Sequence, residues 1–142
     1  MVGGVAVRLC NKTVTIFNAR LNPEIGYEEY YPTVLNGVSW YSTVAANVDS
    51  GGLNAASVYT IRIPADVDAG GKAYADPMEY ADGDAAELWT INQGDVMVKG
   101  AVTESGLTPV QLMQRFGEIV TVLAVTDNRR APNAPHWRVT GK

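Results

Sequence analysis

The feature that most constrains the fold of this chain is an alternation of apolar and polar residues with a period of two. It is clearest over residues 13–17, 38–44, 58–63 and 136–140, which are rich in β-branched and aromatic residues. Such alternation is typical of half-buried strands. With turn residues between the runs, it predicts a mainly β chain of about seven short strands, either a small SH3-like β-barrel or a compact sandwich.

Turn residues and alternation together predict local detail. Asn36-Gly37 is the strongest two-residue hairpin signal and predicts a turn between strands over 27–35 and 38–44. Because successive side chains of a strand point to opposite faces, the alternation also predicts a core. The residues expected to be largely buried are Trp40, Ile61, Val98, Val122 and Trp137.

One short helix is predicted near residues 108–116. Thr108 is a suitable N-cap, Pro109 fits the first helical position, and Gln111 completes a capping box with Thr108. Gly117 follows where a glycine often ends a helix. This helix is the only one that the pattern signals well.

The length of 142 residues suits one domain. We divide it into an N-terminal arm over 1–11 and a β-barrel domain over 12–142, with a loop excursion at 64–88. No apolar run reaches the 18 residues of a membrane span, and the first ten residues do not resemble a signal peptide. A single cysteine cannot form an intramolecular disulfide, so we expect assembly in the cytoplasm and no membrane partner.

The net charge of −4 is unevenly distributed along the chain. Residues 1–23 carry three basic residues and no acid, and residues 115–142 have a net charge of +3. Residues 64–88 have a net charge of −6, with seven acids and only Lys72 to oppose them. The overall negative charge argues against a protein whose whole surface binds nucleic acid.

Motifs of catalysis and metal binding are weak in this sequence. His136 is the only histidine and Cys10 the only cysteine, and neither belongs to a recognisable nucleophile–base pattern. Asp66-x-Asp68 resembles the start of a calcium loop, but the later ligand positions are missing. We therefore predict no catalytic residue, no bound metal, no cofactor and no enzyme activity.

Several segments, in order along residues 12–142, resemble small proteins of tailed bacteriophages that are encoded between the capsid and tail genes. The segments are Thr13–Asn18, Gly37–Tyr41, Tyr59–Pro64, Gln93–Val96, Val125–Arg130 and His136–Gly141. The resemblance implies a head–tail joining or head-closure protein of a phage or prophage, with a small barrel fold. It rests on ordered segments and includes no catalytic signature.

The resemblance also implies partners and a location. The chain is expected to form a homo-oligomeric ring, twelve-fold in order, in the neck of the virion. Portal or adaptor proteins would lie on the head side, tail proteins on the other side, and DNA at most in the lumen. The alternatives are a tail-completion (tail terminator) ring subunit, a small-barrel module for single-stranded nucleic acid, and a hydrolase with an acidic site in 64–88. Residues 27–44 contain no Lys or Arg, which counts against the nucleic-acid module.

Interface residues are predicted from charge and aromatic content. The acidic excursion is expected to reach out of the barrel toward a neighbouring subunit, against a basic N-terminal arm or the Arg129-Arg130 loop. Its contacts are expected to bury Tyr74, Met78, Tyr80 and Leu88. The full set of candidates is Arg8, Lys12, Tyr30, Tyr31, Asp66, Asp68, Tyr74, Met78, Tyr80, Asp82, Asp84, Arg129 and Arg130.

Overall fold

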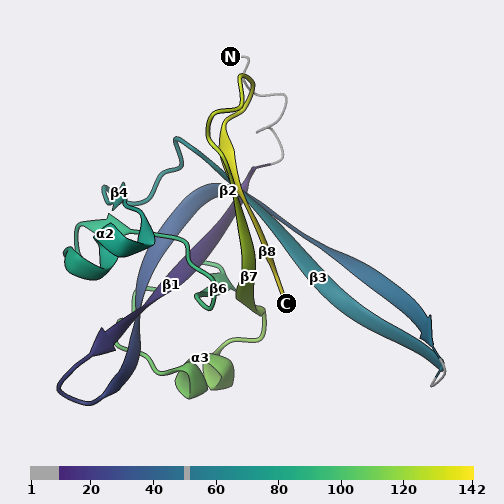
Figure 1. Ribbon diagram of the computed structural model, residues 1–142, viewed down its shortest axis with the longest axis horizontal. Coiled ribbons are helices and arrows are strands. Elements are labelled where there is room, and N and C mark those ends of the chain that lie inside the picture. Colours follow the sequence, from purple (N-terminus) through teal and green to yellow (C-terminus); the bar gives the residue numbers. More distant parts are fainter. Residues whose placement is uncertain (1–9, 50–51) are drawn as a thin grey trace.

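The computed structural model describes residues 10–49 and 52–142. Its main element is an antiparallel sheet of six strands, β1 (Lys12–Asn22), β2 (Tyr27–Asp49), β3 (Gly52–Pro64), β6 (Val96–Lys99), β7 (Ile119–Asn128) and β8 (His136–Gly141). The strand order is β1-β2-β3-β8-β7-β6, and β6 also pairs with β1, so the sheet curls into a small barrel (Figure 1). The prediction of a mainly β chain with a small barrel is confirmed.

The inward positions of the strands form the main core. Ile61, Val122 and Trp137 are buried there as predicted, and Val98 is buried in a second cluster. Trp40 is only half buried, so that part of the prediction is wrong. It packs beside Tyr59 with a centroid distance of 5.6 Å, at the edge of the core where β2 and β3 begin to leave the barrel.

The predicted hairpin turn at Asn36-Gly37 is also wrong, because β2 runs through both residues without a break. Gly37 has a φ of +90°, which glycine adopts without strain, and it bends the strand there. The backbone N–H of Asn36 bonds the carbonyl oxygen of Asp68 at 2.9 Å. At this bend β2 changes partner: up to Val38 it pairs with β1, and from Ser39 onward it pairs with β3.

Beyond the barrel, β2 and β3 continue as a two-stranded ribbon made of residues 43–49 and 52–58, which we call the β2–β3 ribbon. Figure 1 shows it projecting from the barrel. Its register is regular, and β8 pairs with β3 only from Tyr59 onward. Both outer edges of the ribbon therefore lack a strand partner among the described residues. The sequence analysis missed it, because the small residues around Gly52 interrupt the alternation.

The predicted helix is α3 (Pro109–Arg115), and its capping box is formed as expected. The Thr108 hydroxyl accepts from the backbone N–H of Gln111, whose side chain accepts from the backbone N–H of Thr108. Leu112 is buried in the second core cluster, together with Phe17 of β1. The helix therefore covers the outer face of the barrel at β1 and β6.

The excursion at 64–88 contains three short elements. These are β4 (Ala73–Tyr74), α2 (Pro77–Asp82) and β5 (Leu88–Trp89), with β4 and β5 paired in parallel. The excursion is a folded layer beside β1 (Figure 1).

In the described part of the chain, no helix is long and apolar enough to cross a membrane.

Replacing Gly141 with alanine should lower the free energy of unfolding by about 1–3 kcal/mol, because an added methyl group overpacks the end of β8. A Cβ at this position would collide with the side chain of Val120 and with the backbone of Thr121. Urea denaturation measures the effect. Gly117→Ala is the matched control, since a Cβ there meets nothing within 4 Å. Equal stability of the two variants would contradict the packing at Gly141.

Candidate interaction surfaces

The acidic excursion folds back onto the barrel of its own chain, which corrects the prediction that it reaches out. Tyr80 is buried, and Tyr74 and Leu88 are half-buried. The Tyr74 ring lies 4.6 Å from the ring of Trp137, measured between centroids. Of the apolar residues expected to bury against a neighbour, only Met78 is exposed, at 85%. Aromatic rings in this segment complete the core of their own domain, which the sequence pattern alone does not show.

Arg20 of β1 holds α2 in place. Its guanidinium donates to the carbonyl oxygens of Tyr80 at 3.1 Å, Ala81 at 3.3 Å and Gly83 at 2.8 Å. It also lies 5.0 Å from the centroid of the Tyr80 ring. The last carbonyls of a helix lack intrahelical partners and carry partial negative charge. Because α2 has no basic residue in its last turn, Arg20 supplies the missing donors from the barrel.

Lys72, the one base of the excursion, is bonded to β2. Its Nζ donates to the carbonyl oxygen of Pro32 at 2.9 Å and to the Thr33 hydroxyl at 3.0 Å, and burial lowers its pKa. All seven acids of the segment are exposed, and none forms an ion pair within the described residues. We call five of them, together with exposed Met78, the acidic face: Asp76, Glu79, Asp82, Asp84 and Glu87.

Arg129 is held by its own chain rather than left free for a partner. Its Nη2 lies 2.6 Å from Asp127 Oδ2, and this bond lowers the pKa of Asp127 to about 2. The guanidinium carbon lies 4.9 Å from the Tyr74 ring centroid and 5.0 Å from that of Trp137. Such cation–π contacts fix Arg129 as a cover over the aromatic cluster. Arg130, the next residue, is exposed.

Two further arginines that the sequence analysis did not single out lie side by side on the barrel. Arg62 of β3 is directly opposite Arg138 of β8, and both are exposed. Their neighbours across the sheet are Ser39 of β2 and Thr126 of β7, so this row contains no carboxylate. We call the outward face of β3 and β8 around these arginines the basic wall. Each arginine occupies an outward position of its alternation, but only the strand register shows that the two are adjacent.

The remaining interface candidates are scattered. Tyr30 is 8% exposed and belongs to the second core cluster, so its side chain offers little surface to a partner. Tyr31 is half-buried, and Lys12 is exposed at the start of β1. Asp66 is exposed near the top of a pocket described next. Arg8 lies outside the described residues.

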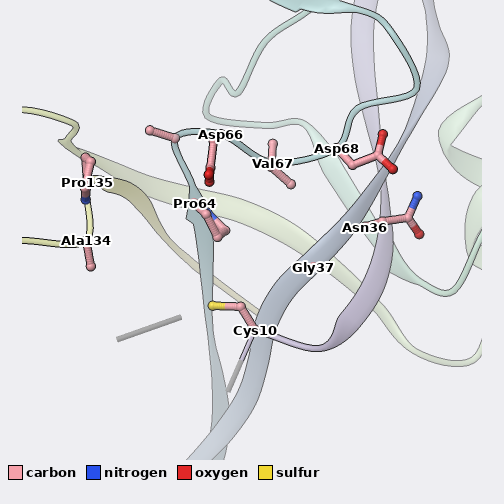
Figure 2. A pocket seen from close by; sticks show the side chains of 10 residues that line it. Cys10, Asn36, Gly37, Pro64, Asp66, Val67, Asp68, Ala134 and Pro135 are labelled. Carbon is pink, nitrogen blue, oxygen red and sulfur yellow. The ribbon is translucent and has the colours of Figure 1, made fainter. Parts of the chain in front are cut away.

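A pocket of about 580 Å³ opens where the start of β1, the bend of β2 and the loop after β3 meet. Figure 2 shows Cys10 across the pocket from Asp66 and Asp68. Burial raises the pKa of the Cys10 thiol, which keeps it protonated and weakly nucleophilic. Pro64 and Pro135 supply apolar walls. The lining thus joins a neutral thiol with exposed carboxylates and has no nucleophile–base pair.

His136 bonds within the loop between β7 and β8. Its Nδ1–H donates to the carbonyl oxygen of Ala134 at 2.8 Å, and its Nε2 lies 3.5 Å from the amide nitrogen of Asn128. These contacts connect the two ends of the loop between β7 and β8. Among the described residues, no group of three or more His, Cys, Asp or Glu side chains is arranged to hold a metal ion.

The fold is a small β-barrel domain with an exposed acidic surface and an exposed basic surface. Over residues 9–142 the sequence matches the family of unknown function DUF6751, and the chain belongs to this family. Comparisons with curated proteins and with solved structures found no significant match.

Proposed function

We propose that this chain is a structural, non-enzymatic subunit of a tailed phage or prophage, which forms a head–tail connector ring between the capsid portal assembly and the tail. The observation that carries the proposal is the β2–β3 ribbon. It extends a closely packed barrel with a regular two-stranded hairpin whose outer edges have no strand partner in the described chain. The sequence resemblance to phage neck proteins supplies the particular assembly.

A projecting ribbon of this kind has a physical reason to meet another protein. An isolated two-stranded hairpin is marginally stable in water, and its free edges are templates for further strands. Natural proteins protect such edges with Lys, Pro or a bulge. Residues 43–58 contain no Lys, no Pro and one charged residue, Asp49, and the pairing has no register shift. These features suit a segment that is covered after assembly.

The charged surfaces support the same proposal. A ring subunit needs two different faces that meet heterologously. The acidic face around α2 and the basic wall on β3 and β8 differ in charge and are formed by different elements of the chain. Complementary charge favours correct docking over wrong partners.

Removing the gene from the phage genome that encodes it tests the proposal. We expect filled heads and complete tails that stay unjoined, seen by electron microscopy of lysates, with joining restored by the gene supplied on a plasmid. Normal numbers of joined particles would contradict the proposal. Heads joined to tails of abnormal length would indicate the tail-completion alternative instead. A gene for an unrelated tail-fibre protein is the control, since its loss leaves joined particles.

A further inference from the structure

Two separate surfaces of this domain carry unpaired charge of opposite sign. In the order β1-β2-β3-β8-β7-β6, β8 is three strands from β1 in either direction. Arg20 of β1 anchors α2, the helix of the acidic face. Arg138 lies on β8 and Arg62 on the adjacent β3. Figure 1 shows α2 beside β1, and the excursion also contacts Trp137 of β8 through Tyr74.

The basic wall is unfavourable for an isolated chain. Like charges directly opposite each other on neighbouring strands destabilise a sheet. Arg62 and Arg138 form such a pair, and no carboxylate of the described residues forms an ion pair with either. The rows on each side of them are also free of acids: Tyr41, Thr60, Thr140 and Ala124 in one, and Pro64, His136 and Asn128 in the other. An acidic partner surface would offset this repulsion.

The acidic face is the matching surface. Its five carboxylates are exposed and unpaired within the described chain, while the nearby bases Arg20 and Lys72 are engaged with backbone oxygens. Met78 of α2 is exposed and offers apolar area, which interfaces require in addition to charge. Tyr41, in the row next to Arg62, also offers apolar area, with 42% of its surface exposed.

We infer that the basic wall of one copy binds the acidic face of the next copy, with Arg62 and Arg138 against the carboxylates around α2. The inference rests on the proposed ring function and names the surfaces that build the ring. Because the two surfaces are formed by different parts of the same chain, each copy can bind one neighbour through each of them, which is the heterologous pairing that builds a ring. A second copy is favoured over nucleic acid, since the chain has a net charge of −4 and itself carries the acidic counterpart.

Complementary charge reversal of the full chain tests the inference. Arg62→Glu/Arg138→Glu reverses the basic wall, and Glu79→Lys/Asp82→Lys reverses the acidic face. Light scattering and negative-stain microscopy at low salt should show oligomers of the wild type. Each variant alone should have a dissociation constant raised at least tenfold. An equimolar mixture of the two should recover oligomers, because each reversed surface then meets a complementary one.

The control variant is Lys99→Glu/Arg115→Glu, which changes the net charge by the same amount as the basic-wall variant. Its two residues already have partners, Glu118 and Glu104, and both pairs are exposed. We expect it to oligomerise like the wild type, since exposed ion pairs contribute little to folding. Circular dichroism of every variant checks that the fold is intact.

Other outcomes overturn the inference and leave the function to be judged separately. If the basic-wall variant still forms rings, these surfaces are not the interface, although the connector function stands. If the basic-wall variant keeps its rings but no longer shifts a labelled single-stranded oligonucleotide that the wild type binds, the wall is a nucleic-acid surface. A wild type that stays monomeric at low salt and millimolar concentration also overturns the inference, while the gene-removal experiment decides the function.

Discussion

Replacing Trp137 with alanine should lower the free energy of unfolding by about 3–5 kcal/mol, the range for a fully buried large aromatic residue. Trp137 is 2% exposed and is the centre of the aromatic cluster that joins the excursion to the barrel. Its ring lies 5.4 Å from Trp89 and 4.6 Å from Tyr74, between centroids. The truncation would therefore open a cavity shared by two parts of the fold. Urea denaturation followed by far-ultraviolet circular dichroism measures the loss.

Trp137→Phe is the matched variant. Its cost should be clearly smaller, because a phenyl ring keeps much of the stacking with Tyr74. It also removes the indole N–H, which is buried without a hydrogen-bond partner in the described residues. An alanine variant as stable as the wild type would show that Trp137 does not hold the excursion to the barrel.

The stability of the protein should fall as the pH rises from about 4 to 7, and Asp95 should be a main cause. Asp95 is 3% exposed, and burial raises the pKa of its carboxyl from 3.8 to about 6, with a further contribution from Glu28. Its oxygens accept from the Asn18 amide at 2.8 Å and from the backbone N–H groups of Ala19 at 3.1 Å and Asn92 at 3.0 Å. These bonds favour the charged form but only partly offset the loss of water.

The sign follows from proton linkage. Because the folded state holds this proton more tightly than the unfolded state, the contribution to stability is complete below pH 3.8 and is lost as the pH rises through about 6. The difference between the two pKa values corresponds to about 3 kcal/mol. Asp127 titrates outside this window, because its pKa is lowered to about 2.

Asp95→Asn isolates the contribution of this carboxyl. The amide oxygen can still accept from Asn18 and Asn92, whereas its nitrogen cannot accept from Ala19. The free energy of unfolding of both proteins is measured by urea denaturation at several pH values between 4 and 7. Plotted against pH, it should fall steeply for the wild type and much less for the variant. Parallel curves would mean that Asp95 does not titrate in this range, and that the buried network around it is not as described.

The surfaces described above also bear on the alternatives to a connector ring. A hydrolase with an acidic site in 64–88 requires carboxylates gathered in a cleft with a nucleophile or base. Five acids of this segment belong to the exposed acidic face, and Asp66 and Asp68 line the pocket opposite the protonated Cys10 thiol, without a nucleophile–base pair. A nucleic-acid barrel requires exposed aromatic residues interleaved with bases. The basic wall offers two arginines and exposed Tyr41, so the oligonucleotide experiment above addresses that reading directly.

Local patterns in the sequence were enough to predict the mainly β fold class, several strand positions and the helix α3. The alternation around Ile61 and Val139 identifies inward positions, because side chains of a strand alternate whatever its partner. The capping box at Thr108 is equally local, since all of its bonds lie within four residues. Short-range periodicity therefore predicts the fold class and the inward positions of these strands.

What the sequence did not reveal depends on contacts between distant residues. Asn36-Gly37 satisfies the rule for a hairpin turn, yet long-range pairing with both β1 and β3 carries β2 straight through it. The excursion has no periodicity, and contacts with distant residues bring it back to the barrel: its rings pack on Trp137, Arg20 bonds the end of α2, and Lys72 bonds β2. Arg62 and Arg138 are 76 positions apart in the chain, and only strand register makes them neighbours. Strand register and packing depend on the free energy of the whole core, so they cannot be predicted from one segment alone.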